Sequence, residues 1–241
     1  MAHLFFTGDT HGDPINHLNR FRNRAKYLEL TKEDFLIICG DFGCFFDGAN
    51  KKQLDWLDAC PWTTLFIDGN HENFELLYAL EEKEMFGGLV GIAGQSIFHL
   101  KRGEIYTVLG KKIFCFGGGV SIDKIFRVEG VSWWPQEIPS DAEFRHGMEN
   151  LDKHGWDVDI VITHTMPLSA IKEFELGEIH GLSEKFKDPT ATYLDQVLEA
   201  VAFKHWFAGH FHVNRYFLDG KICCLWDTIV ELGVDKYHKT C

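Results

Sequence analysis

Acidic and imidazole side chains recur along this sequence at spacings that suit a shared metal ion. The first pair, Asp9 and His11, lies in the segment Gly8-Asp9-Thr10-His11-Gly12, directly after a short apolar run. Residues two apart on an extended chain point to the same side, so both side chains can bind one ion. The flanking glycines permit the tight turns that such a site needs.

Four later apolar runs end in residues of the same kinds. Their candidate site residues are Asp41, Asn70, His71, His164, His210 and His212. Oxygen and imidazole ligands without a thiolate suit manganese, iron or zinc. A single catalytic zinc-type site uses three protein ligands and a water, so the larger number of candidates predicts two ions. Two ions about 3.5–4 Å apart need a bridging carboxylate, and Asp41 is the natural candidate.

The predicted ions decide which substrate the site attracts. Two divalent ions carry more positive charge than Asp9, Asp41 and a bridging hydroxide cancel, so a phosphate oxygen is the expected guest. The ions should also lower the pKa of bound water toward about 7, which provides a hydroxide nucleophile. The net charge of −12 argues against long nucleic acid, because binding its backbone needs a basic face. A phosphorylated small molecule or a nucleotide is the expected substrate.

The elements that carry these residues alternate between strand and helix in the first third of the chain. Expected strands cover residues 3–6, 34–39 and 63–67, and expected helices cover residues 13–26, 50–59 and 74–83. This alternation predicts an α/β fold with a mostly parallel sheet and covering helices. Ligands of such sheets bind beyond the carboxyl ends of the strands, so residues far apart in sequence can meet at one edge.

The rest of the chain is predicted to be more varied. Expected strands cover residues 96–100, 104–109, 112–116, 157–162, 205–207, 215–218 and 221–225. A hairpin is expected at Gly110-Lys111-Lys112, and irregular chain at 120–139. Ser140 and Glu143 have the spacing of a capping box that begins a helix to about residue 154. A loop is expected at 171–188 and a helix at 190–202, and the charged run 81–84 is interpreted as a solvated helix face.

Length and composition predict one soluble domain over residues 1–241. The apolar runs are far too short to cross a bilayer, and we expect no signal peptide and no membrane partner. Seven scattered cysteines without a CxxC pair are typical of free thiols in the reducing cytoplasm, where we expect the protein. The oligomeric state stays open.

Five blocks together identify a family. GDTHG, GDFG, GNHE, THTMP and GHFH, in this order over residues 8–212, resemble the calcineurin-like metallophosphoesterase superfamily, in its small single-domain bacterial and phage form. The resemblance implies a two-sheet β-sandwich flanked by helices, in four α-β-β-α layers, with a dinuclear site at one edge. It implies a first ion on Asp9, His11 and His212, a second ion on Asn70, His164 and His210, and Asp41 as the bridge. Manganese is the foremost expectation for both ions, with iron or zinc as alternatives.

The resemblance also implies the chemistry. A metal-bridging hydroxide would attack phosphorus, while His71 would face the substrate, stabilise the transition state and protonate the leaving oxygen. Asn70 and His71 would both contact substrate, and Glu72 would shape their turn. The chain is accordingly predicted to be a metal-dependent phosphoesterase, with His71 and Asp41 as its catalytic residues.

Two features separate this chain from the protein serine/threonine phosphatases of the superfamily. Those enzymes carry an Asp and an Arg where this chain has Cys44 and Phe45, and Asp47 is a candidate to replace that Asp. The segment 117–135 resembles a stretch in small bacterial and phage members. We expect it to overhang the metals, with Arg127 or Lys124 touching substrate; the alternative is a surface ion pair between Asp123 and Arg127.

Several alternatives stay open. The activity could be that of a phosphomonoesterase, a phosphodiesterase or nuclease, or a protein serine/threonine phosphatase. A binding module that has lost its chemistry is the non-enzyme alternative, although every expected ligand is present. Trp133 and Trp134 are expected to anchor the loop or the core, and His180 could approach the site.

Overall fold

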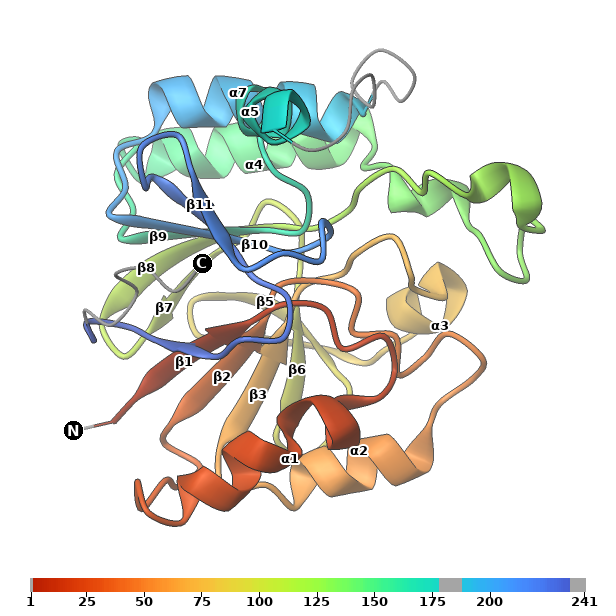
Figure 1. The fold of residues 1–241 in the computed structure, drawn as a ribbon, viewed down its shortest axis with the longest axis vertical. Helices are drawn as coiled ribbons and strands as arrows, with labels where there is room; N and C mark the ends of the chain where they lie inside the picture. The colour runs from red at the N-terminus through yellow and green to blue at the C-terminus, as the bar shows by residue number, and fades with distance from the viewer. Residues whose placement is uncertain (1, 178–187, 235–241) are drawn as a thin grey trace.

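The computed structural model describes residues 2–177 and 188–234, with the side chains of 175–177 left aside. Two β-sheets stack face to face, and helices cover the outer face of each one (Figure 1). This is the four-layer α/β sandwich expected from the motifs, and it brings the carboxyl ends of strands from both sheets to one side of the molecule.

The first sheet has a parallel centre and antiparallel edges. In spatial order its strands are β13 (Val230–Glu231), β1 (Leu4–Thr7), β2 (Phe35–Ile38), β3 (Thr63–Phe66), β6 (Ile97–Leu100), β5 (Gly88–Ile92) and β4 (Glu82–Met85). Strands β1, β2, β3 and β6 run parallel to one another, whereas β13, β5 and β4 pair antiparallel. The parallel strands all end at the same edge.

The second sheet follows the same plan. In spatial order its strands are β11 (Arg215–Phe217), β12 (Ile222–Cys224), β10 (His205–Ala208), β9 (Ile160–Thr163), β8 (Lys111–Phe116) and β7 (Ile105–Val108). Strands β12, β10, β9 and β8 are parallel. The predicted hairpin is confirmed, because β7 pairs antiparallel with β8. The predicted strands at 215–218 and 221–225 also pair antiparallel, as β11 and β12.

The helices divide between the two outer faces. They are α1 (Pro14–Ala25), α2 (Lys51–Asp58) and α3 (Phe74–Tyr78) on the first sheet, and α4 (Asp141–Lys153), α5 (Leu168–Gly177) and α7 (Pro189–Ala200) on the second. Side chains cap the N-termini of α1, α2, α3, α4 and α7, and the capping box of Ser140 and Glu143 is present as predicted.

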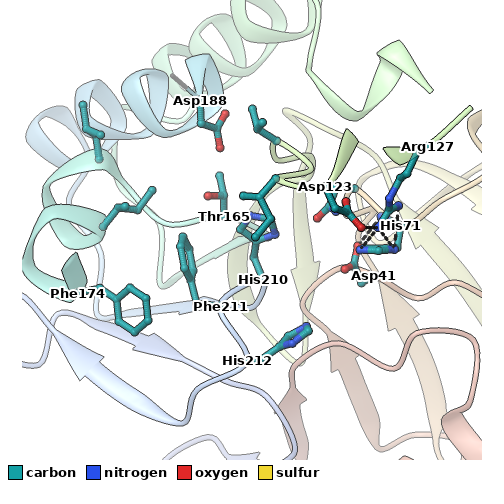
Figure 2. A pocket seen from close by; sticks show the side chains of 15 residues that line it. Asp41, His71, Asp123, Arg127, Thr165, Phe174, Asp188, His210, Phe211 and His212 are labelled. Carbon is teal, nitrogen blue, oxygen red and sulfur yellow. Dashed lines mark hydrogen bonds and ion pairs between the residues drawn. The ribbon is translucent and has the colours of Figure 1, made fainter. Parts of the chain in front are cut away.

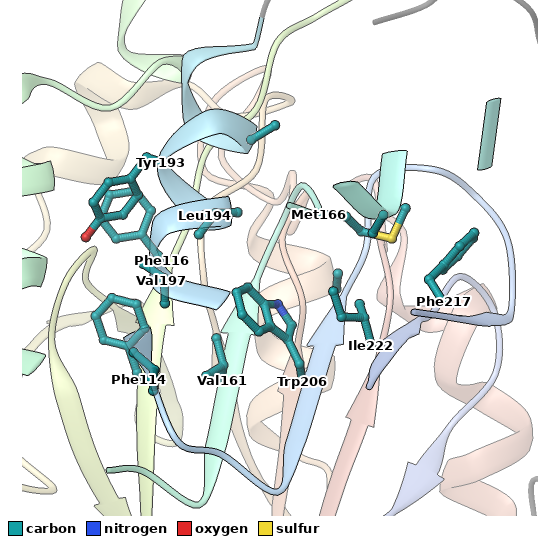
Figure 3. Packing of buried hydrophobic residues seen from close by; sticks show 14 of the residues in the cluster. Phe114, Phe116, Val161, Met166, Tyr193, Leu194, Val197, Trp206, Phe217 and Ile222 are labelled. Carbon is teal, nitrogen blue, oxygen red and sulfur yellow. The ribbon is translucent and has the colours of Figure 1, made fainter. Parts of the chain in front are cut away.

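Successive side chains along a strand point to opposite faces of its sheet. This gives three apolar layers, one between the two sheets and one between each sheet and its helices. In β1, Leu4 and Phe6 face the space between the sheets, whereas Phe5 faces α1, as the period of a strand requires. The same holds in the second sheet, where Trp206 packs beneath α7 with Val161 (Figure 3). Both sheets are thus covered on both faces, which fixes their strand ends as rigid supports for side chains.

Two predicted elements are wrong. The helix expected at 74–83 ends at Tyr78, and the charged run belongs partly to the edge strand β4 instead of a helix face. Charged side chains at a sheet edge discourage pairing with other chains, so the sequence fits this position equally well. Strand β5, which lies between β6 and β4, and edge strand β13 had no counterpart in the sequence prediction.

The loop expected at 171–188 is the second error. Helix α5 spans Leu168–Gly177 and buries Ala170, Ile171 and Phe174, a spacing that favours a helix. The remainder of that segment, with His180, lies outside the described residues. Among the described helices, none combines the length and the apolar character needed to cross a membrane.

The stretch 120–139 is irregular, as predicted. It forms an arm that extends sideways from the sandwich (Figure 1) and contains two short 3-10 turns, Lys124–Phe126 and Pro135–Glu137. Trp134 is 3% exposed within the core under α1 and α3, and Trp133 is half-buried beneath Lys124. Both tryptophans therefore anchor the arm, as expected.

Candidate metal centre

All the predicted site residues come together at one edge of the sandwich. Asp9, Asp41 and the Asn70–His71 pair follow β1, β2 and β3 of the first sheet, while His164, His210 and His212 follow β9 and β10 of the second. The centre is therefore built from five strand ends that belong to two different sheets.

Three side chains form one half of this centre. The Oδ2 atom of Asp9 lies 3.3 Å from Nε2 of His212 and 4.0 Å from Nε2 of His11. The two imidazole Nε2 atoms are 2.9 Å apart. One ligand atom from each of these residues lies within 4.8 Å of the others, a separation that suits a shared cation. These are the residues predicted for the first ion.

The other half lies around His164, whose side chain is buried. Its Nε2 atom lies 2.9 Å from Oδ1 of Asn70, 3.2 Å from Nδ1 of His210 and 3.3 Å from Oδ1 of Asp41. The second carboxylate oxygen of Asp41 lies 3.7 Å from Nδ1 of His11. Asp41 thus contacts both halves, which is the position that a bridging ligand requires.

The hydrogen bonds around His164 indicate that a cation belongs there. Its Nδ1 atom lies 3.0 Å from the carbonyl oxygen of Cys39, which can only accept, so Nδ1 carries the proton. A neutral His164 would then direct a bare lone pair at Oδ1 of Asn70, another acceptor. A second proton on the ring or a metal ion resolves this conflict, and carbonyl-bound imidazoles of this kind are typical of metal ligands.

The charges of the site favour the same conclusion. Burial raises the pKa of Asp41, but His164, His71, His11 and an N–H bond from the His71 backbone outweigh it and hold that pKa well below its ordinary range. Burial lowers the pKa of His210 to about 3, and His164 adds to this. His210 is therefore neutral near pH 7, as a metal ligand must be.

The backbone at the site adopts uncommon conformations. Positive φ angles of 45° to 70° occur at four of the candidate ligands, namely His11, Asp41, His210 and His212. For residues other than glycine such angles cost energy and concentrate at functional sites. Hydrogen bonds hold them in place, including the bond of 2.8 Å from the His11 N–H to the Asp41 carbonyl. Gly40 has a φ of +98°, and a Cβ atom there would collide with the His164 ring.

A buried hydrogen-bond chain orients Asn70, and sequence reasoning missed it. Nδ2 of Asn70 donates to Oγ of Ser121 over 3.0 Å, and that hydroxyl donates to Oε2 of Glu137 over 2.5 Å. The backbone N–H of Ser121 donates to Oε1 of Glu137 over 3.1 Å. All three side chains are at least 95% buried. Because the ionised carboxylate of Glu137 can only accept, every bond in this series of hydrogen bonds runs toward Glu137. The Nδ2 atom of Asn70 therefore faces Ser121, and its Oδ1 atom points to His164.

The candidate ligands suit divalent ions by their chemistry. They comprise two carboxylates, four imidazoles and one amide oxygen, a mixture that suits manganese, iron or zinc. Their number and their division into two halves around Asp41 agree with a dinuclear centre.

His71 lies beside the ligands and contacts Arg127. The Nη2 atom of Arg127 is 3.0 Å from Nε2 and 3.2 Å from Nδ1 of His71, so it contacts the ring and not a single lone pair. The same atom is 2.7 Å from Oδ2 of Asp123. The alternative ion pair of Asp123 with Arg127 is therefore present, and Arg127 also lies against His71 (Figure 2). A contact between Arg127 and substrate stays a prediction. Lys124 instead lies over the Trp133 ring at 4.2 Å.

The positions that distinguish protein phosphatases are occupied by core residues. Cys44 and Phe45 are buried under the helices of the first sheet. Asp47 is exposed, and no hydrogen bond between it and His71 is found among the described residues. Glu72 accepts N–H bonds of 2.7 Å from Phe42 and of 3.2 Å from Gly43, so it joins its own turn to the turn after β2.

A cavity of about 410 Å³ opens beside the ligands. Asp41, Asn70, His71 and Arg127 line one end of it. Its apolar lining comes from Val120, Ile122, Leu168, Ile171, Phe174 and Phe211, and the candidate ligands His210 and His212, with Asp123, Thr165 and Asp188, also line it. The apolar spacing in α5 was the signal that could have revealed this lining.

Comparisons with known proteins identify the family and support the fold. The sequence model of the calcineurin-like phosphoesterase family matches residues 2–214. A lariat debranching enzyme from Entamoeba histolytica is 21% identical over an alignment 257 positions long, which covers 91% of this chain and 66% of the relative. This chain therefore spans just under two thirds of that relative's length. A solved crystal structure that is 11% identical superposes with a TM-score of 0.52 over 92% of this chain and 89% of that one, and this likeness shows the fold alone.

Proposed function

The chain belongs to the calcineurin-like phosphoesterase family, and on that basis we propose that it hydrolyses small phosphate esters with two metal ions bound at this centre. One observation carries the proposal. Two carboxylates, four imidazoles and one amide converge from five strand ends around His164 and His11, and a buried cluster of acceptors needs cations to be stable.

We assign the ligands as the motifs imply. Asp9, His11 and His212 hold the first ion, Asn70, His164 and His210 hold the second, and Asp41 lies between them. When bound, two such ions withdraw electron density from phosphate oxygens and make water a stronger acid. The low pKa of Asp41 keeps its carboxylate charged over the whole physiological range, so it can accept both ions at any such pH.

His71 is proposed as the acid that protonates the leaving oxygen. Burial lowers the pKa of its ring, and Arg127 lowers it further while Asp41 raises it. A lowered pKa makes the protonated ring a stronger acid and also reduces its protonated fraction at neutral pH, so the proposed role rests on the position of His71 beside the candidate ligands. Arg127 would bind a phosphate oxygen from the same side, because its guanidinium lies against the His71 ring.

The acid role of His71 can be tested by the choice of leaving group. A His71→Asn variant should lose about 10² to 10⁴-fold in kcat on alkyl phosphates. It should lose much less on p-nitrophenyl phosphate and bis-p-nitrophenyl phosphate, whose leaving group departs without a proton. Equal losses on both classes of substrate, or full kcat on alkyl esters, would exclude this role.

Arg127 has a matched control on the same turn. Arg127→Ala should raise KM for p-nitrophenyl phosphate about tenfold, as expected for the loss of a charged hydrogen bond. Lys124→Ala, which removes only the contact with Trp133, should leave KM within about twofold. Unchanged KM and kcat in the Arg127→Ala variant would show that Arg127 does not bind substrate.

The proposal as a whole depends on turnover with metal. Metal analysis after loading with manganese should find two ions per chain, and at least one of the two p-nitrophenyl esters should be hydrolysed. Two bound ions without turnover of either ester would favour the binding module instead of the enzyme. The burial of Cys44 and Phe45 speaks against a protein serine/threonine phosphatase.

A further inference from the structure

The two halves of the metal centre differ in how their side chains are held. His164 is buried, and its Nδ1 atom bonds to the carbonyl oxygen of Cys39. The His212 side chain is instead 48% exposed. Within the described chain, the polar contacts found for its ring, to His11 and to Asp9, both involve Nε2. Because Nε2 is the atom that would face the ion, the orientation of this ring depends on a contact elsewhere.

That contact is with the indole of Trp226. The His212 and Trp226 rings are stacked, with their centroids 5.5 Å apart and their planes 15° from parallel, which is the offset geometry that aromatic pairs prefer. A flat ring against one face of an imidazole opposes its rotation, which would otherwise turn Nε2 away from Asp9. The indole is 42% exposed, and it does not belong to the lining of the 410 Å³ cavity.

Hydrogen bonds fix the backbone that carries this indole. Asn214 lies two residues after His212 in the chain. Its Oδ1 atom accepts the backbone N–H of Trp226 over 2.9 Å and that of Thr228 over 3.3 Å. Its Nδ2 atom donates to Oδ1 of Asp227 over 2.6 Å. One short stretch of chain therefore carries both the candidate ligand and the side chain that holds the indole beside it.

Residues 225–228 also contact the end of β1. They lie between β12 of the second sheet and β13 of the first. Oγ1 of Thr7 donates to the carbonyl oxygen of Thr228 over 3.1 Å. A Cβ atom on Gly8 would overlap the backbone of this segment and lie 2.7 Å from Cα of Trp226, so the close approach needs glycine. The segment thus touches both of the strand ends that provide ligands for the first ion.

From this arrangement we propose that Trp226 is a positioning residue of the metal centre. It holds the His212 ring with Nε2 directed at Asp9 and His11, and so sets the affinity for the first ion. The inference rests on the proposed function, which assigns these ligands. Trp226 lies outside residues 2–214, the part of the chain that the family model matches, so this support adds to the shared motifs.

Manganese titration followed by calorimetry tests the proposal without turnover. In the otherwise intact protein, Trp226→Ala should weaken one of the two ions about tenfold, as expected for the outer partner of a metal ligand, and leave the other within about twofold. No loss for either ion, or equal losses for both, would overturn the inference, since equal losses would mean that Trp226 only supports the fold.

Two backgrounds identify the affected ion. His210→Ala removes a proposed ligand of the second ion, and His212→Ala removes one of the first. Trp226→Ala should weaken the remaining manganese about tenfold in the His210→Ala background. It should change the affinity by less than about twofold in the His212→Ala background, because the ring that it supports is already gone. The opposite pattern would refute the assignment to His212.

Conservative variants test the flat ring itself. Trp226→Phe keeps a stacking face and should retain the affinity for the first ion within about threefold. Trp226→Leu keeps apolar cover without a flat ring and should lose about tenfold. Tyr27→Ala is the matched control, because Tyr27 is an aromatic residue that is 89% exposed, and it should leave both affinities unchanged. Equal affinities in the phenylalanine and leucine variants would contradict the stacking argument.

The inference and the proposed function fail in different ways. A selective loss of affinity in Trp226→Ala, without hydrolysis of either p-nitrophenyl ester by the wild-type protein, supports the inference and removes the function. Hydrolysis by the wild-type protein, with unchanged affinities in Trp226→Ala, does the reverse. A rise in KM that persists in Trp226→Ala at saturating manganese would mean that the indole binds substrate, and would also overturn the inference.

Discussion

Replacing Glu137 by Gln should disturb a metal ligand that Glu137 does not touch. The carboxylate accepts two donors from Ser121, the backbone N–H and the hydroxyl. Glutamine has one acceptor and one donor at the same positions. If its amide nitrogen faces the hydroxyl, the hydroxyl proton must turn to Asn70. Asn70 then has to rotate its amide and direct N–H groups at His164, where an oxygen is needed.

The reverse orientation of the glutamine is no better. Its amide nitrogen then faces the backbone N–H of Ser121, so two donors oppose each other in a buried place. Losing a hydrogen bond to a charged group costs about 1.5–3 kcal/mol, and disturbing the outer partner of a metal ligand typically costs about 10–100-fold in affinity. Tenfold corresponds to about 1.4 kcal/mol, so the two estimates agree. We expect Glu137→Gln to weaken the second ion about 10–100-fold.

Manganese titration followed by calorimetry would measure this loss of affinity for the second ion. The affinity for the first ion should change by less than about twofold. The decisive background is Asn70→Asp, because both oxygens of a carboxylate are acceptors and orientation no longer matters. In the Asn70→Asp background, Glu137→Gln should lower the affinity for the second ion by less than about twofold. Ser121→Ala, which removes the middle of the hydrogen-bond chain, should reproduce both results.

Equal losses in the two backgrounds would refute the reasoning, since they would mean that Glu137 only supports the arm. Glu143→Gln is a matched control, because Glu143 forms the capping box with Ser140 and has no part in the chain to Asn70. It should lower the melting temperature slightly and leave both metal affinities within about twofold.

Three further predictions concern the support of the site. Gly40→Ala should abolish binding of the second ion and cost at least about 1 kcal/mol of stability, because its Cβ would collide with His164; binding measured by calorimetry close to wild type would contradict this. Burial raises the pKa of Asp68, but Arg102 and His99 hold it at about 2. A carboxyl with a lowered pKa contributes stability above its unfolded pKa of about 3.9, and loses it as the pH falls toward 2. Asp68 forms a buried ion pair with Arg102, so Asp68→Asn should lower the free energy of unfolding by about 3–5 kcal/mol at pH 7 and reduce the dependence of that free energy on pH between about pH 4 and 2. An unchanged dependence on pH would exclude a contribution of this ion pair to stability. Manganese at about 100 times its dissociation constant should stabilise the fold by about 2.7 kcal/mol, or about 5–10 °C; a melting temperature insensitive to chelator would argue against ions in the native state.

The parts of the fold that the sequence predicted are those with strong periodic or motif signals. Strands β1, β2 and β3 are short apolar runs followed directly by polar turns, so both their type and their ends could be read. The site residues were predicted for the same reason, since each one follows such a run. Whether they bind metal stays a prediction, but their convergence is a property of the structure.

The parts that were missed depend on tertiary contacts. Edge strand β4 has a charged sequence that suits a helix surface equally well, and only its pairing with β5 decides between them. Helix α5 was missed although Ala170, Ile171 and Phe174 have a helical spacing, because so short an apolar pattern does not by itself fix the type of element. Ser121 and Glu137 carry no motif, and their role follows only from the position of the arm over Asn70.

The division of the centre between two sheets has a consequence for how the protein is made. His11 and His212 are 201 residues apart in sequence, and so are Asp9 and His210. During synthesis the first sheet can pair β1, β2 and β3 early, whereas both predicted metal positions lack ligands until β10 and its following turn leave the ribosome. Contacts this distant along the chain form slowly. The nascent chain is therefore expected to capture its ions only after translation of nearly the whole domain, which protects the cell from a half-built centre that holds a reactive metal.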